Sequence, residues 1–118
     1  MKTSRIPGFY KLSVEERIRI VKEFADLTDD EVNTILRTGG LDIIIADKMI
    51  ENVIGTMELP LGIATNFLIN NKEYLIPMAI EEPSVVAAAS NAARMCREGG
   101  GIFSIATESL MISQIQLV

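Results

Sequence analysis

The first part of the chain has apolar residues at helical spacing behind two signals that start helices. Ser13-Val14-Glu15-Glu16 has the form of a capping box, in which the serine side chain caps the helix and the last glutamate reaches back to the serine N–H. The helix that follows is expected to reach about Ala25. Thr28-Asp29-Asp30-Glu31 repeats the signal and predicts a shorter helix that stops at Gly39-Gly40.

A third helix and a pair of strands are predicted for the middle of the chain. Residues 41–54 have apolar side chains at helical spacing, which favours a helix in spite of the β-branched run Ile43-Ile44-Ile45. A strand is expected over residues 56–69. Asn70-Asn71-Lys72 is typical of a turn, and residues 73–80 predict the returning strand.

An alanine-rich helix and two short strands are predicted for the rest of the chain. Pro83 suits the first position of a helix, where its missing N–H costs nothing, and the helix is expected to run to about residue 98. Residues 102–107 and 110–118 each predict a strand. The polar and apolar alternation of the last strand stops without a turn, which predicts that the chain is an N-terminal piece of something longer. Together these elements predict an α+β fold.

Composition is typical of a globular protein and excludes several kinds of site. Of the 118 residues, 48% are hydrophobic and 23% charged, and the formal net charge of −5 gives no support to a nucleic-acid partner. The chain has one cysteine, Cys96, and no histidine, so neither a disulfide nor a metal site is predicted. No apolar run approaches the ~18 residues of a membrane span, and we expect a cytoplasmic protein without a membrane partner.

The strongest candidate for chemistry is a pair of carboxylates at the start of the alanine-rich helix. Glu81 and Glu82 come directly after an apolar strand and before Pro83. Apolar surroundings would raise the pKa of a carboxyl group there, and the helix dipole would lower it. From the residues alone, an acid at this place is more often structural, since the dipole stabilises it by about 0.3–1 kcal/mol. Ser84 can donate to a ligand oxygen or satisfy a local backbone group.

Three further features allow a functional and a structural interpretation. Residues 1–25 contain six lysines and arginines against three glutamates, which could attract an anion but is more often a solvated helix face. Gly99-Gly100-Gly101 follows a helix instead of preceding one, so a helix stop is a better interpretation than a phosphate-binding loop. Glu51-Asn52 can hydrogen-bond across an interface or simply end the third helix.

Two of these segments together resemble the 3-hydroxy-3-methylglutaryl-coenzyme A (HMG-CoA) reductase family. Glu51-Asn52-Val53-Ile54-Gly55, followed after a strand hairpin by Glu81-Glu82-Pro83-Ser84, is similar to two motifs of that family, and the second has the form found in the class II enzymes of bacteria and archaea. The resemblance covers essentially all of the chain in the right order. It implies that residues 1–107 are the N-terminal part of the substrate-binding domain and that residues 108–118 begin the nucleotide-binding domain.

The resemblance implies a two-step reduction of HMG-CoA to mevalonate and coenzyme A, with two hydrides from NAD(H) or NADP(H). It implies that Glu82 is the catalytic glutamate, which protonates oxygens of the reacting group, and that Ser84 contacts the hydroxymethylglutaryl group. Glu51 and Asn52 match a segment that builds the dimer interface beside the active site in the family. A homodimer with shared active sites is therefore expected.

The other catalytic groups of the family have no counterpart in this chain. The resemblance implies that the lysine, aspartate and histidine and the nucleotide-binding residues lie beyond position 118, so no cofactor-binding residue is expected here and the chain is expected to be inactive alone. Tyr10 stands where the family has a basic contact to coenzyme A phosphates. A non-enzymatic module, in which residues 51–55 and the apolar hairpin form an obligate dimer, is the alternative interpretation.

Overall fold

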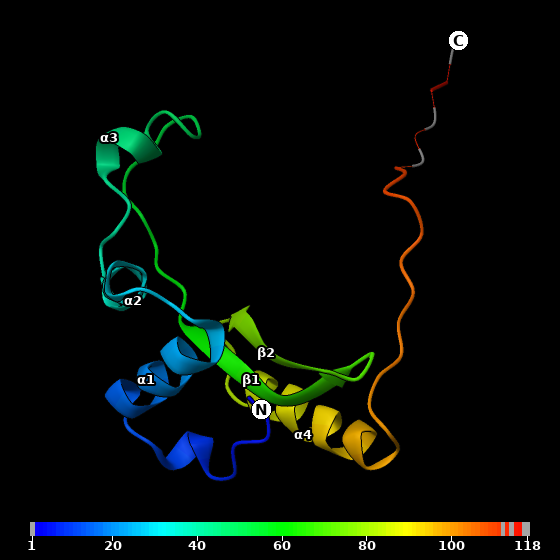
Figure 1. Cartoon of the computed structure of the whole chain (residues 1–118). Helices are drawn as coiled ribbons and strands as arrows, with labels where there is room; N and C mark the ends of the chain where they lie inside the picture. Colours follow the sequence, from blue (N-terminus) through cyan, green and yellow to red (C-terminus); the bar gives the residue numbers. More distant parts are fainter. Residues whose placement is uncertain (1, 112, 114, 117–118) are drawn as a thin grey trace.

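The computed structural model describes residues 2–111, 113, 115 and 116, and it has the expected α+β architecture. A two-stranded antiparallel sheet lies at its centre, and a long helix packs on the first strand (Figure 1). In chain order the elements are η1 (Phe9–Lys11, a 3-10 turn), α1 (Val14–Ala25), α2 (Asp29–Leu36), α3 (Ile43–Ala46), β1 (Leu61–Ile69), β2 (Lys72–Ala79) and α4 (Val85–Glu98).

Helices α1 and α2 begin where their capping signals predict. The Ser13 hydroxyl accepts a hydrogen bond from the Glu16 N–H at 3.2 Å, and Glu16 Oε2 accepts one from the Ser13 N–H at 2.8 Å. Thr28 and Glu31 make the same exchange at the start of α2, at 3.3 and 2.7 Å. Each box satisfies N–H groups that the first helical turn leaves unpaired, and such a cap stabilises a helix by about 1 kcal/mol. Both predicted caps are confirmed.

The hairpin is closed by a tight asparagine turn. Ile69 pairs with Lys72, so only Asn70 and Asn71 connect the two strands, with φ of 49° and 63°. Positive φ at both central residues is the geometry of a type I′ turn, whose twist matches that of antiparallel strands, and asparagine tolerates it better than most residues. The predicted turn is confirmed.

The contact between β1 and α4 is made by small buried residues. Ala64 on β1 and Ala93 on α4 are 0% and 3% exposed. Gly62 lets the start of α4 approach, because a Cβ there would lie 3.2 Å from a methyl group of Val86. The short distance between strand and helix therefore depends on small side chains, and it sets the position at which α4 begins.

The third predicted helix is wrong in length. Within residues 41–54 only the four-residue α3 forms, and the chain continues from it in turns. The isoleucines at 43, 44 and 45 lose side-chain freedom in a helix, and they are at least half exposed, so no packing compensates for that loss. β1 also begins at Leu61 instead of residue 56, because Pro60 has no N–H to donate to the ladder.

The segment after α4 follows the free edge of β1 only briefly. Ile102 forms an isolated parallel bridge with Ile69, in which the Ile102 N–H donates to the Leu68 carbonyl at 2.8 Å and its carbonyl accepts from Asn70 at 2.9 Å. The strand predicted for residues 102–107 is therefore wrong, since the chain leaves the sheet edge after this contact. The strand predicted for 110–118 lies partly outside the described residues, and those described there carry no strand.

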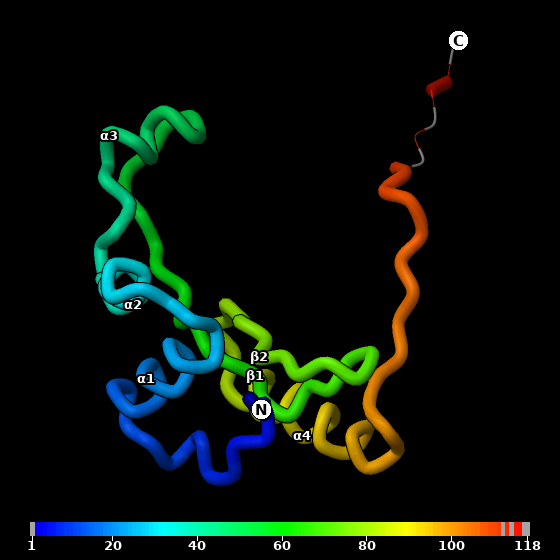
Figure 2. Tube along the Cα trace, in the orientation of Figure 1, coloured from blue at the N-terminus to red at the C-terminus, as the bar shows by residue number. Residues whose placement is uncertain are grey.

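Two segments extend away from this body. Residues 37–60, here called the arm, rise on one side of the sheet, and residues 105–111 rise on the other (Figure 2). The radius of gyration is 18.6 Å, against about 13 Å for a compact domain of this length. Large apolar side chains on both segments, among them Ile54 and Ile105, are almost completely exposed. Exposed apolar surface of this kind marks a place where a protein contacts another segment or subunit.

Candidate active site

The carboxylate pair lies in a sharp connection between the sheet and α4. At the start of this connection the Ile80 N–H donates to the Pro60 carbonyl at 3.2 Å. At its end Ser84 is the N-cap of α4, and its carbonyl accepts the first helical hydrogen bond, from the Ala88 N–H at 2.8 Å. Residues 81–83 lie between these two points and are all exposed. The connection is thus fixed at both ends and open in the middle.

Helix α4 begins two residues later than predicted. Pro83 lies in a turn, and Ser84 has φ 70° and ψ −11°, so Val85 is the first helical residue. These angles match the third position of a type II turn, for which proline is common at the second. Pro83 therefore shapes the turn before the helix instead of the first helical turn, and the prediction for it was wrong.

Ser84 has an unusual backbone and a side chain that does not cap its helix. Left-handed backbone costs a non-glycine residue about 1–2 kcal/mol, and such strain is concentrated at functional sites. The Ser84 hydroxyl makes no capping hydrogen bond to α4. It can therefore serve a ligand, and the structural role that the sequence also allowed for it, satisfying a backbone group in the first helical turn, is not the one seen.

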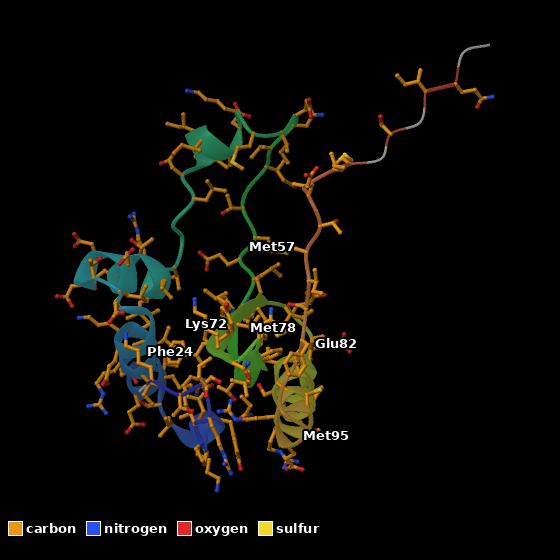
Figure 3. The ribbon with its side chains drawn as sticks, turned by 45° about the vertical axis from the view of Figure 1, so that its right-hand side comes forward. Phe24, Met57, Lys72, Met78, Glu82 and Met95 are labelled. Atoms are coloured by element: carbon orange, nitrogen blue, oxygen red, sulfur yellow. The ribbon has the colours of Figure 1, made fainter. Side chains whose placement is uncertain are left out.

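Glu82 is exposed in this chain, as is Glu81. The apolar surroundings predicted for the pair are not formed by the described residues, because β2 has already ended at Ala79 and α4 packs on β1. Figure 3 shows Glu82 at the start of α4, with Met95 toward the other end of the same helix. The carboxylate is accessible to a ligand that approaches the start of α4.

A set of hydrogen bonds fixes the first turns of α4 on β1. The Ser90 hydroxyl donates to the Val86 carbonyl at 2.8 Å and accepts from the Thr65 N–H at 3.0 Å. The Asn66 side-chain amide donates to the Ser90 carbonyl at 3.0 Å. Because Thr65 is buried and both of the bonds donated by β1 end on Ser90, the helix cannot slide along the strand without breaking them. The position of Ser84, a turn and a half earlier, follows from this contact.

Ser84 lines a broad groove of about 1700 Å³ between the N-terminal segment, α1, the end of α2, the two ends of the arm, the hairpin and the start of α4. Its charged lining residues are Arg5, Arg17, Arg37, Arg94 and Glu58. Four arginines against one carboxylate make the groove positive in a chain of negative net charge, which suits an anionic ligand. The sequence indicated the positive charge of residues 1–25 but not Arg37 or Arg94, since only the fold brings these segments together.

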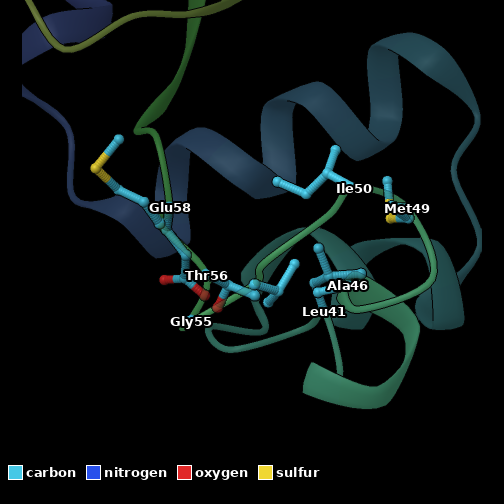
Figure 4. Close-up of a pocket in the computed structure, with 9 residues that line it drawn as sticks. Leu41, Ala46, Met49, Ile50, Gly55, Thr56 and Glu58 are labelled. Atoms are coloured by element: carbon cyan, nitrogen blue, oxygen red, sulfur yellow. The ribbon is translucent and has the colours of Figure 1, made fainter.

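Glu51 and Asn52 lie on the arm, where they follow α3 in a turn. Neither lines the groove that contains Ser84, and two views show the arm turned away from α4 (Figures 1 and 3). The arm has its own pocket of about 200 Å³ (Figure 4), with a largely apolar lining of Leu41, Ala46, Met49, Ile50, Val53, Gly55, Thr56, Met57 and Glu58. Within one chain the structure therefore does not bring the Glu51-Asn52 pair beside the carboxylates.

The triple glycine lies at the end of α4 and not at the start of a helix. Gly99-Gly100-Gly101 follows α4, as the sequence predicted, and precedes no helix among residues 102–111.

Among the described residues no three His, Cys, Asp or Glu side chains lie close enough to hold a metal. No helix in that part combines the length and apolar character needed to cross a membrane. The expected cytoplasmic location stays a prediction.

Comparison with known proteins gives one consistent result. The model of a family described as hydroxymethylglutaryl-coenzyme A reductase matches residues 13–118. The 3-hydroxy-3-methylglutaryl-coenzyme A reductase of Archaeoglobus fulgidus is 71% identical over 115 residues, which are 98% of this chain and 26% of that protein. The probable reductase of Borreliella burgdorferi is 37% identical over 110 residues, or 93% of this chain and 24% of that protein.

A solved structure agrees with the sequence relatives. The class II reductase of Streptococcus pneumoniae, described as bound to NADPH in open conformations, matches with a TM-score of 0.73 and 37% identity, over 82% of this chain and 26% of that one. The fold of this chain is therefore that of a segment of such a reductase. The chain spans about a quarter of the length of these relatives.

Proposed function

This chain belongs to the hydroxymethylglutaryl-coenzyme A reductase family, and we propose that it forms the front of the substrate-binding domain in an enzyme that interconverts HMG-CoA with mevalonate and coenzyme A. In this proposal residues 1–107 belong to that domain and residues 108–118 begin the nucleotide-binding domain. The catalytic lysine, aspartate and histidine expected from the resemblance come from other parts of the polypeptide. The chain alone is inactive.

The arginine-lined groove that reaches Ser84 is the observation that carries this proposal. HMG-CoA has three phosphate groups and a carboxylate, so its negative charge is complementary to a groove with four arginines. The groove lies along the start of α4, and Glu82 is only two residues before Ser84. A substrate that lies in the groove can thus place its acyl end at the carboxylate pair.

In this proposal Glu82 handles protons and Ser84 orients the acyl group. Reduction of a thioester carbonyl puts negative charge on its oxygen, and a carboxylic acid within hydrogen-bond distance stabilises that charge and donates the proton. The Ser84 hydroxyl donates to an oxygen of the hydroxymethylglutaryl group. The hydrides come from NADH or NADPH, held by residues outside this chain.

The stoichiometry of turnover tests this function. In the complete protein, conversion of HMG-CoA to mevalonate consumes two reduced nicotinamides and two protons and releases one coenzyme A thiol. We expect nicotinamide absorbance and thiol titration, followed in the same reaction, to give two oxidised nicotinamides per thiol. Absence of HMG-CoA-dependent oxidation, or thiol release without oxidation, would contradict a reductase.

Two substitutions at Ser84 separate its hydroxyl from its backbone. Ser84→Ala and Ser84→Gly both remove the hydroxyl, and each is expected to raise KM for HMG-CoA by about tenfold, the loss of one hydrogen bond to substrate. Only glycine adopts the left-handed backbone freely. The glycine variant should therefore be more stable than the alanine variant, with a free energy of unfolding about 1 kcal/mol higher. Urea unfolding and steady-state kinetics of the complete protein measure the two effects. Unchanged KM in both variants would remove Ser84 from the substrate site.

We propose that the arm joins two copies of the protein. Its exposed isoleucines and methionines and its apolar pocket support this, because surface of that kind is typical of permanent subunit interfaces. Glu51 and Asn52 then act from the partner subunit or at its border.

Light scattering of the complete protein should give twice the monomer mass, and a monomer at micromolar concentration would contradict the proposal. The same surface also suits the alternative, a non-enzymatic dimer module, which the turnover assay distinguishes.

A further inference from the structure

The Glu73 carboxylate joins three segments that are distant in the sequence. Arg97, near the end of α4, donates from Nη1 to Glu73 Oε2 at 2.9 Å and from Nη2 to Oε1. The Ser4 N–H donates to Oε2 at 3.0 Å, and the Ser4 hydroxyl lies 2.5 Å from the same atom. Ser4 is completely buried, and the side chains of Glu73 and Arg97 are each only 20% exposed. We call these three residues the clamp.

The clamp lies beside the one irregularity of the hairpin. The β1–β2 ladder is interrupted between Ala64 and Phe67, where Asn66 has φ 70°. The Asn66 N–H, left without a strand partner by this bulge, donates to the Ser4 carbonyl at 2.9 Å. Arg97 Nη1 also lies 3.4 Å from the Asn66 carbonyl. The N-terminal segment is thus bonded both to the bulge and to the carboxylate.

The residues directly after the clamp form a wall of the groove. Residues 5–10 all line it, together with Ser84. Their far end is held by the 3-10 turn η1, in which Phe9 is 9% exposed. Between Ser4 and Phe9 the chain has only four residues, so two fixed ends determine where this wall lies. Arg5, the first residue of the wall, contributes one of the four arginines.

We propose that the Ser4–Glu73–Arg97 clamp is a positioning element for the substrate: it holds residues 5–10 as the wall against which the anionic thioester binds. The proposal rests on the proposed function and assigns no chemical step to the clamp. Its three members do not line the groove themselves, so their effect on the substrate passes through the segment that Ser4 anchors.

The charge state of the clamp is constant in the neutral range. The Arg97 hydrogen bonds, followed by those from Ser4, lower the pKa of Glu73 from 4.5 to about 2, against the opposing effect of burial. Because the pKa is lower in the folded protein, the ionised carboxylate stabilises the fold fully above pH 4.5, and this stabilisation is lost as the pH falls toward 2. At neutral pH the clamp is therefore a closed ion pair.

Kinetics of clamp variants of the complete protein test the proposal. Glu73→Gln leaves Arg97 without its counter-charge, and we expect KM for HMG-CoA to rise by about tenfold or more while kcat changes by less than about threefold. Arg97→Lys keeps the charge but loses the paired hydrogen bonds, so its KM should lie between those of Glu73→Gln and the wild type. Asp29→Asn, which breaks the exposed Lys22–Asp29 pair, is the matched control and should leave KM unchanged.

Cleavage by trypsin reports how firmly residues 5–10 are held, independently of activity. Arg5 is a trypsin site directly after the clamp, and its N–H donates to the Thr3 hydroxyl at 3.2 Å. Cleavage of the Arg5–Ile6 bond, followed by mass spectrometry, should be slow in the wild type and in Asp29→Asn and at least about tenfold faster in Glu73→Gln. If Glu73→Gln fails to fold, Ser4→Ala, which removes only a hydroxyl, takes its place with the same expectation of higher KM and faster cleavage.

The outcomes distinguish failure of the positioning role of the clamp from failure of the proposed function. An active wild type whose folded clamp variants are less stable but keep KM and the slow cleavage would overturn the positioning role. A rise in KM together with faster cleavage after Arg5 supports it, and more so when Arg97→Lys is intermediate. A complete wild-type protein without reductase activity would overturn the proposed function and the substrate role together, whatever trypsin shows.

Discussion

The Glu82→Gln variant of the complete protein is expected to lose nearly all reductase activity. Glutamine has the size of the acid but no acidic proton to transfer, and loss of a general acid costs about 10²- to 10⁴-fold in rate. Because Glu82 is exposed and takes no part in the bonds that fix α4, the fold should be unaffected. Steady-state kcat with HMG-CoA measures the effect, and circular dichroism and light scattering check fold and assembly.

The kinetic form of the loss is as informative as its size. If Glu82 acts on charge that develops during reduction, kcat falls while the affinity for HMG-CoA, measured by titration calorimetry, changes little. A variant with normal kcat and weak binding would instead make Glu82 a binding residue. Turnover within a few-fold of the wild type would remove it from the chemistry altogether.

Gly101→Ala is expected to have the largest effect on stability, about 2–4 kcal/mol. Gly101 has φ +98°, and a Cβ there would lie 2.6 Å from the Leu68 carbonyl oxygen. The same carbonyl accepts the Ile102 N–H at 2.8 Å, so the added methyl group pushes away the strand edge to which the next residue bonds. Urea unfolding of the complete protein gives the total loss.

Gly100→Ala is the matched control for this substitution. Gly100 has φ +101°, nearly the same backbone strain, but a Cβ there would meet no atom within 4 Å. Its cost is therefore limited to the backbone term of about 1–3 kcal/mol, and the difference between the two variants isolates the steric overlap. Hydrogen exchange of the Ile102 amide should be faster in Gly101→Ala only. Equal stability of both variants with Ile102 still protected would contradict the close contact seen here.

Features encoded in a few neighbouring residues could be predicted from the sequence. The capping boxes at Ser13 and Thr28 and the turn at Asn70-Asn71 depend on side chains within three residues of the backbone groups they serve. For the same reason the alanine-rich helix and the hairpin were found, with errors of a few residues at their ends. The family resemblance, now confirmed, rests on the order of two short motifs.

Features that depend on distant contacts could not be predicted. The helix expected over residues 41–54 needs a partner surface to compensate for three consecutive isoleucines, and the described chain provides none. The clamp could not be predicted because Ser4 and Glu73 are 69 residues apart, and nothing in either segment indicates the other. The left-handed backbone of Ser84 was missed as well, since serine is not a residue that usually marks such a position.

The surroundings of the carboxylate pair differ between the sequence prediction and the structure. The sequence suggested apolar surroundings, whereas Glu81 and Glu82 are both exposed in this chain. The residue that carries the backbone strain and lines the groove is Ser84, two positions later. The position of Ser84 is therefore set by the turn and the packing of α4, while the described residues leave Glu82 exposed. In the proposed function, the substrate and segments outside this chain supply the environment of Glu82.

In the proposed function the two neighbouring carboxylates are unequal, and Glu82 alone handles the proton. A direct comparison of Glu81→Gln and Glu82→Gln in the complete protein, at saturating HMG-CoA, tests it. We expect Glu81→Gln to keep kcat within about tenfold of the wild type and Glu82→Gln to lose about 10²-fold or more. Equal activity of the two variants, or greater loss in Glu81→Gln, would contradict it.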